Sequence, residues 1–140
     1  MKQTLSSNEF QSAVNYQIRL LGTHVYIHKF DEEKTGKNSI YNEASEKKYK
    51  APISLIAIPV FDLSEKILTE AGMDRANTDV ILKTSRTQLL NKKLLGRNEK
   101  LFINENDLVE LNGEKFEITK ISPKDHYEYF QVYYIGAQKV

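Results

Sequence analysis

The stretch Asp107–Ala137, DLVELNGEKFEITKISPKDHYEYFQVYYIGA, contains the strongest fold signal in this sequence. The pair Asn112-Gly113 separates two runs of β-prone residues. A tight hairpin turn that matches the twist of its strands needs a positive φ at both central positions, and Asn-Gly tolerates that conformation. The sequence therefore predicts an antiparallel hairpin over residues 107–121.

A third β-prone run follows the hairpin, over residues 128–136, and its last residue is a glycine that we expect to end it. Residues 122–125 (SPKD) are expected to break the preceding strand, because proline has no N–H for a sheet ladder. Within the hairpin, Phe116 and Ile118 share one face, and we expect Leu108 to lie opposite them. The third run is apolar on both faces, which predicts a central strand or a strand at a subunit contact.

Residues 7–21 are predicted to form an amphipathic helix. Ser6 and Glu9 have the spacing of a capping box, which satisfies N–H groups at a helix start, and Gly22 is placed to end the helix. Four apolar side chains share one face at helical spacing: Phe10, Val14, Ile18 and Leu21. That face either packs on the chain's own sheet or docks onto a neighbouring protein.

Three further runs, residues 23–30, 51–61 and 78–84, are predicted strands. The nearly continuous apolar character of residues 51–61 predicts burial on both faces. Asp62-Leu63-Ser64-Glu65 repeats the capping pattern and predicts a short helix or turn that runs to Gly72. Ser85 is positioned to cap a further short helix after the strand 78–84. The second of these helices is expected to be lined by four leucines and closed by a glycine: Leu89, Leu90, Leu94, Leu95 and Gly96.

This element order predicts an α+β, mostly β fold. We expect a small antiparallel β-barrel or curled sheet with an N-terminal helix and one or two further short helices. With 140 residues, the chain is expected to form a single domain, residues 1–140, that buries a sizeable core.

The composition disfavours several classes of protein. There are no cysteines, which excludes disulfides, thiolate metal sites and cysteine nucleophiles. No apolar run approaches the roughly 20 residues of a membrane span, and the first residues lack an apolar signal core, so we expect no membrane association. The formal net charge is +1, whereas strong nucleic-acid binders carry a clear basic excess.

Catalytic motifs were sought and none was found. The six glycines are scattered singly, and neither His-Glu-x-x-His nor Gly-x-Ser-x-Gly occurs. His24 and His28 lie on a predicted strand, where four residues span about 13 Å, too far for both rings to bind one ion. We therefore expect no enzyme activity, no cofactor, and no catalytic, cofactor-binding or metal-binding residues.

The most polar stretch is residues 31–50, which contains five acidic and five basic side chains. A connection of this length without periodicity is usually functional or disordered. Its tyrosines and its basic–aromatic cluster predict a subunit or partner contact at Tyr41, Lys47, Lys48, Tyr49 and Lys50. A purely solvated loop and a nucleic-acid contact are the alternatives.

Residues 38–135 resemble the neck proteins of tailed bacteriophages, the head-closure (stopper) and head–tail connector families. The resemblance is carried first by DLVELNGEKFEITKISP (residues 107–123), which is similar to the C-terminal barrel hairpin of those proteins. Further similar segments are Tyr41-Asn42-Glu43 followed by Tyr49 and an apolar strand with prolines, Gly72-x-Asp74 leading to Asp79–Lys83, and Leu89–Leu95.

The resemblance implies a structural virion component that joins the phage head to its tail and helps to retain packaged DNA. Such proteins form rings below the portal, typically of six or twelve copies, so a homo-oligomer with portal or adaptor and tail proteins as partners is expected. DNA would pass through the ring without sequence-specific binding, and the protein would be in the virion neck after assembly in the host cytoplasm. Stopper, adaptor and tail terminator all remain open, and residues 31–50 are the expected neighbour or channel contact.

The alternative is a small β-barrel module that binds a peptide or single-stranded nucleic acid. In that case the third run and nearby aromatic residues would form the binding face. The tyrosines that could stack on bases are Tyr127, Tyr129, Tyr133 and Tyr134. Binding to nucleic acid would weaken steeply with salt, whereas a neck protein has no such requirement.

Overall fold

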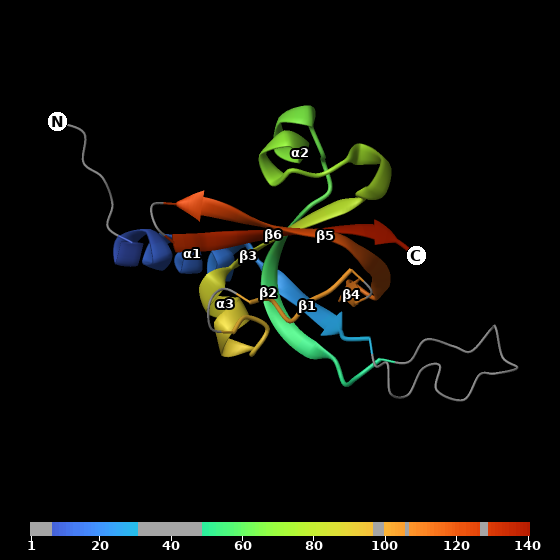
Figure 1. Cartoon of the computed structure of the whole chain (residues 1–140), viewed down its shortest axis with the longest axis horizontal. Helices are drawn as coiled ribbons and strands as arrows, with labels where there is room; N and C mark the ends of the chain where they lie inside the picture. The colour runs from blue at the N-terminus through green and yellow to red at the C-terminus, as the bar shows by residue number, and fades with distance from the viewer. Residues whose placement is uncertain (1–6, 31–48, 97–99, 106, 127–128) are drawn as a thin grey trace, which may run out of the picture.

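A computed structural model describes residues 7–30, 49–96, 100–105, 107–126 and 129–140. Within these ranges, six strands form a closed antiparallel barrel in the order β1-β2-β3-β6-β5-β4 (Figure 1). The strands are β1 Thr23–His28, β2 Ile53–Val60, β3 Val80–Ser85, β4 Leu108–Leu111, β5 Glu114–His126 and β6 Tyr129–Lys139. The helices are α1 Ser7–Leu21, α2 Glu65–Ala71 and α3 Arg86–Asn91, with a 3-10 turn at Arg75–Asn77. The predicted fold class is confirmed, and the sheet closes into a barrel.

The β4–β5 hairpin forms where the sequence predicts it. Asn112 and Gly113 have φ values of 52° and 81°, so both central positions are left-handed. The register pairs Val109 with Phe116 and Leu108 with Glu117. The predicted position of Leu108 opposite the Phe116 face is therefore wrong by one residue, which on a strand reverses the face.

Strand β5 continues through Pro123 to His126, so the predicted break at residues 122–125 is wrong. Here β5 pairs with β6, Pro123 lying opposite Tyr133, whereas its pairing with β4 ends at Glu117. No other described strand pairs with this part of β5, and a proline is tolerated at such an open edge.

Strand β6 lies between β3 and β5 in the barrel, so it has a strand on each side, as expected for the central strand that its apolar character predicts. It passes through Gly136 instead of ending there. A Cβ at this glycine would lie 2.5 Å from the sulfur of Met73, so the position is glycine because another side chain packs on it. Met73 follows α2 and belongs to the apolar cluster between that helix and the barrel.

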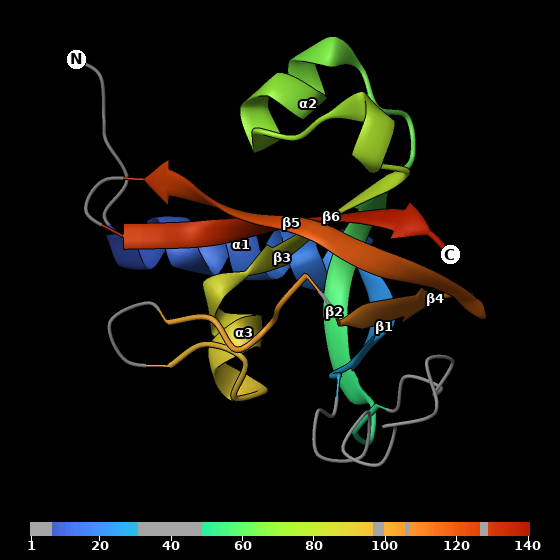
Figure 2. The same ribbon diagram turned by 45° about the vertical axis from the view of Figure 1, so that its right-hand side comes forward.

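The barrel interior holds the main core, and two smaller clusters lie outside it. The main core includes Val25, Ile27, Leu55, Ala57, Val80, Leu82, Val109, Leu111, Phe116, Ile118, Tyr133, Ile135 and Ala137. Val14 and Ile18 of α1 pack on Val132, and α2 packs over Ile81 and Tyr134. Tyr134 contacts both outer clusters, so α1 and α2 pack on the same outer face of β6. In both ribbon views α2 lies above the β5–β6 ribbon and α3 lies below it (Figures 1 and 2). The helices thus explain why β2 and β6 are apolar on both faces.

The N-terminal helix has the predicted bounds and packs on the chain's own sheet. Gly22 follows it and donates its N–H to the carbonyl of Ile18 at 2.8 Å. Leu21, predicted to share the buried face, is instead 59% exposed, because it is the last helical residue before the chain turns into β1. The predicted cap Ser6 lies outside the described residues, as does the side chain of Phe10.

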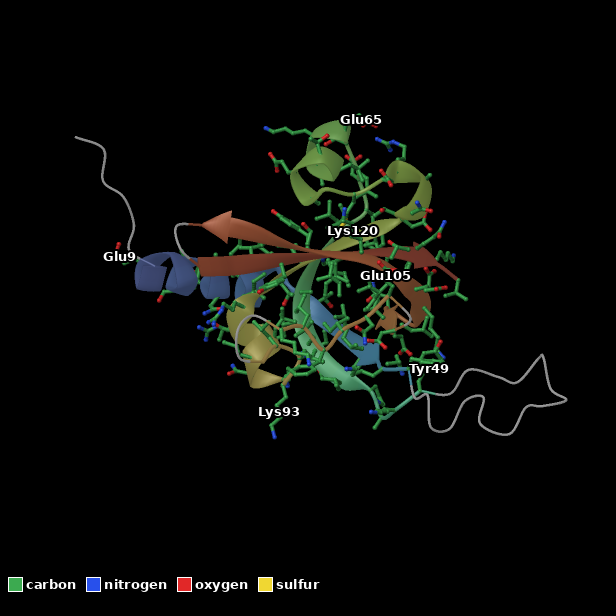
Figure 3. The ribbon with its side chains drawn as sticks, viewed as in Figure 1. Glu9, Tyr49, Glu65, Lys93, Glu105 and Lys120 are labelled. Atoms are coloured by element: carbon green, nitrogen blue, oxygen red, sulfur yellow. The ribbon has the colours of Figure 1, made fainter. Side chains whose placement is uncertain are left out.

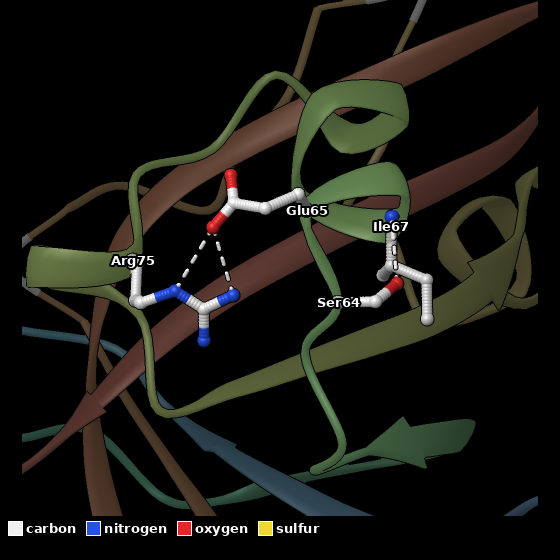
Figure 4. Close-up of polar contacts among 4 residues, drawn as sticks. All are labelled: Ser64, Glu65, Ile67 and Arg75. Atoms are coloured by element: carbon white, nitrogen blue, oxygen red, sulfur yellow. Dashed lines mark hydrogen bonds and ion pairs between the residues drawn. The ribbon is translucent and has the colours of Figure 1, made fainter.

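Both short helices begin where capping was predicted, but the cap of α2 is Ser64 and not the first residue of the predicted Asp62–Glu65 pattern. The Ser64 hydroxyl accepts the N–H of Ile67, and Gly72 ends α2 with a φ of 67° (Figure 4). Ser85 caps α3 in the same way, through the N–H of Gln88.

Helix α3 ends at Asn91, several residues before the predicted closure at Gly96. Lys93 then has a φ of 58°, which turns the chain. Leu94 and Leu95 therefore belong to the main barrel core instead of to a helix face. The prediction of a longer helix was wrong because these leucines also have the spacing of a helix face.

Candidate functional site

Two of the five predicted contact residues fall in the described part of the chain. Tyr49 and Lys50 lie there, and Tyr41, Lys47 and Lys48 are outside it. Tyr49 forms an isolated antiparallel bridge with Phe30, and the Lys50 N–H donates to the carbonyl of Lys29 at 2.8 Å. Tyr49, labelled in Figure 3, therefore lies next to Phe30 at the end of the barrel where β1 finishes.

An aromatic pair lies at this junction. The rings of Phe30 and Tyr49 meet edge to face, with centroids 6.0 Å apart and planes at 71°. Partial burial raises the pKa of the Tyr49 hydroxyl, and the negative charges of Glu117 and Asp107 raise it further. The phenol therefore stays neutral over the physiological range and is available as a hydrogen-bond donor.

A buried carboxylate fixes the same end of the barrel. Asp107 is 1% exposed, and its two oxygens accept the N–H groups of Phe30 and Asn104, each at 2.8 Å. Its carbonyl accepts the N–H of Ile118 at 3.0 Å. The side chain of Asp107 thus joins the end of β1 to the segment before β4, and its backbone carbonyl adds strand β5. Because both oxygens have donors, burial of the charge is compensated, and we assign Asp107 a structural role.

A partly exposed aromatic ring lies beside this junction, flanked by lysines. The ring of Phe102 is 40% exposed, and the ammonium groups of Lys29 and Lys100 lie 5.9 and 5.6 Å from its centroid. The Lys29 ammonium also donates a hydrogen bond to the carbonyl of Phe102. We call the set Lys29, Tyr49, Lys50, Lys100 and Phe102 the basic–aromatic surface.

The backbone around Phe102 is held in place by short-range pairing. Its N–H donates to the carbonyl of Leu94 at 2.8 Å, and the Gly96 N–H donates to the carbonyl of Lys100 at 2.8 Å. A Cβ at Gly96 would lie 2.7 Å from the Phe102 ring, so the glycine makes room for it. The ring of Phe102 thus packs on Gly96, and its backbone is paired with Leu94.

A shallow depression of about 450 Å³ lies next to this surface. It is lined by Leu101, Ile103, Asn104, Glu105 and Ile121. Its lining combines three apolar side chains with one amide and one carboxylate, which is no recognisable catalytic arrangement.

The two strand histidines have separate partners. His24 Nδ1 lies 3.3 Å from the Ser54 hydroxyl, and His28 Nε2 lies 3.4 Å from a Glu110 oxygen. Among the residues that the structure describes, no group of three or more His, Asp or Glu side chains is placed to hold a metal ion. In the same ranges no helix has both the length and the apolar character needed to cross a membrane.

The tyrosine face predicted for the binding-module alternative does not form as expected. Tyr133 is 1% exposed and lies in the main barrel core, and Tyr134 is half-buried between the outer clusters. Tyr127 and the side chain of Tyr129 lie outside the description. Tyr133 is therefore a core residue, and Tyr134 is packed against the outer clusters, because β6 is covered on both faces.

Sequence reasoning missed three members of the basic–aromatic surface. Lys29, Lys100 and Phe102 come from segments about 70 residues apart in the chain. Only the closure of the barrel between β1 and β4 brings these segments together. The local signal is a lysine close to a phenylalanine in each segment, Lys29-Phe30 and Lys100-Leu101-Phe102, which is similar to the pattern at residues 47–50.

Comparison with known proteins adds no assignment. No protein-family model matches this chain, and no curated protein matches it either. The functional argument therefore depends on the residues and their arrangement.

Proposed function

We propose that this chain is a structural subunit of the neck of a tailed bacteriophage, where it joins the portal to the tail and helps to retain packaged DNA. The observation that carries the proposal is the hairpin over residues 107–123, the most extensive of the segments that resemble neck proteins. That hairpin occupies β4, the Asn112-Gly113 turn and the first part of β5.

The other resembling segments map to consecutive elements of one barrel, which supports the proposal. Gly72 ends α2, and Asp74 begins the turn that leads into β3. Asp79 precedes β3 and residues 80–83 lie in it, and residues 89–95 span the end of α3 and the buried turn after it. The segment Tyr41-Asn42-Glu43 lies outside the described residues, and the others belong to elements of one barrel.

The surface of the subunit also suits assembly. Tyr16 and Leu20 are each 66% exposed on α1, on the side opposite the buried Val14 and Ile18. Phe30 and Tyr49, which flank residues 31–48 in the sequence, are paired at one end of the barrel. A ring subunit needs apolar contact area on its flank and a segment that reaches a neighbour or the channel.

The proposal includes the partners and the location of the protein. The chain assembles in the host cytoplasm into a homo-oligomeric ring of six or twelve copies and is retained in the virion neck. Portal or adaptor proteins contact one side and tail proteins the other. DNA passes through the ring without sequence-specific binding, which accords with a formal net charge of only +1.

A tagged copy of the chain, expressed during phage production, should retain portal and tail proteins on an affinity resin. Mass spectrometry of the eluate identifies them. A tagged chain with Asn112→Val and Gly113→Val is the matched control, because loss of the hairpin turn removes the folded barrel but not the tag. Recovery of cellular proteins alone, or equal recovery with the control variant, would argue against the neck assignment.

A further inference from the structure

We infer that the basic–aromatic surface binds single-stranded nucleic acid, with its lysines on the phosphates and Phe102 against a base. The inference does not depend on the proposed neck role. It rests on the juxtaposition of an exposed ring with ammonium groups from two distant segments.

The described contacts around Phe102 hold the ammonium groups of Lys29 and Lys100 in position, and none of these contacts is with a carboxylate. Lys29 directs one N–H at the Phe102 carbonyl, and an ammonium has three donors. Among the residues that the structure describes, no carboxylate pairs with Lys29, so its other donors can reach phosphate oxygens. The nearby carboxylate of Asp107 is buried and already accepts two backbone N–H groups. It therefore does not compete as a partner for these cations.

The distances leave the ring accessible. Both ammonium groups lie close to the roughly 6 Å limit of a cation–π contact, where the attraction is weak. A phosphate can draw either lysine away from the ring at little cost. The exposed ring of Phe102 is then free for base stacking, which is tolerant of sequence because every base has a π-face.

This combination favours a single strand over the other polyanions. A duplex offers phosphates to the lysines but keeps its bases stacked and away from the ring. An acidic peptide offers carboxylates but no planar base.

The test is fluorescence anisotropy of a labelled oligothymidylate with the purified full chain, across a range of salt concentrations. Three lysines on phosphates predict a slope of log K against log salt of about −2, from about −0.7 per single-stranded phosphate. Phe102→Leu keeps an apolar side chain but removes stacking, and should weaken binding about tenfold. The double variant Lys29→Gln with Lys100→Gln should reduce the salt slope by about 1.4.

Lys66→Gln is the matched control, because this exposed lysine lies on α2, away from the Tyr49 end of the molecule (Figure 3). It should bind like the parent chain, and circular dichroism of each variant confirms that the barrel is intact. Failure to bind the oligonucleotide, or equal losses for Lys66→Gln and the surface variants, would overturn the inference. So would equal binding of a duplex or of polyglutamate with no effect of Phe102→Leu, because lysines alone would explain that result.

Discussion

Replacing Asp107 with alanine should lower the free energy of unfolding by about 2–5 kcal/mol. The reason is that the backbone N–H groups of Phe30 and Asn104 both lose their acceptor at a position that is 1% exposed. Each unsatisfied donor costs about 1–3 kcal/mol when water cannot replace the partner. Urea unfolding followed by circular dichroism measures the change.

Two variants separate the hydrogen bonds of Asp107 from other effects. Asp107→Asn keeps one oxygen acceptor and should recover about half of the loss, because one N–H remains paired. Glu105→Ala, at an exposed carboxylate close by in the chain, should change stability by less than about 0.5 kcal/mol. A parent-like stability for Asp107→Ala would show that this carboxylate does not hold the barrel end together.

Replacing Asn112 and Gly113 together with valine should cost about 3–4 kcal/mol or prevent folding. Both positions have positive φ values, 52° and 81°, which β-branched residues resist. A Cβ at Gly113 would meet no atom within 4 Å, so the cost is conformational and not a clash. Thermal melting by circular dichroism gives the size of the effect.

The control for the turn is Gly113→Asn, which tolerates the left-handed conformation and should cost less than about 1 kcal/mol. A melting curve for the double valine variant that overlays the parent curve would show that this turn does not determine the hairpin.

The parts of the fold that could be predicted are those determined by local chemistry. The Asn112-Gly113 turn needs a backbone conformation that few residue pairs adopt, and the Ser64 and Ser85 caps satisfy N–H groups within one helical turn. Strand β6 is apolar on both faces, which correctly indicated a strand with neighbours on both sides. Its inner face lines the barrel core, and helices cover its outer face.

The errors have a common cause, which is that the deciding contact was distant in sequence. Pro123 does not break β5, because no described strand pairs with the other edge at that point. Gly136 accommodates Met73 instead of ending β6. Leu94 and Leu95 belong to the barrel core, although their spacing is equally typical of a helix face.

The candidate site was predictable only in part for the same reason. Tyr49 and Lys50 stood out as a local basic–aromatic cluster. Their neighbours Lys29, Lys100 and Phe102 are brought there by barrel closure, which no local pattern specifies. Tyr133 shows the converse, because an aromatic residue that looked available for stacking is buried in the core.

The most direct test of the neck role is electron microscopy of particles assembled after deletion of the gene for this chain. The proposal predicts heads without attached tails, many of them having lost their DNA, together with free tails in the same lysate. Expression of the parent chain in trans should restore complete particles, and the Asn112→Val, Gly113→Val variant should not. Complete tailed particles at the parent frequency in the deletion lysate would contradict the proposed function.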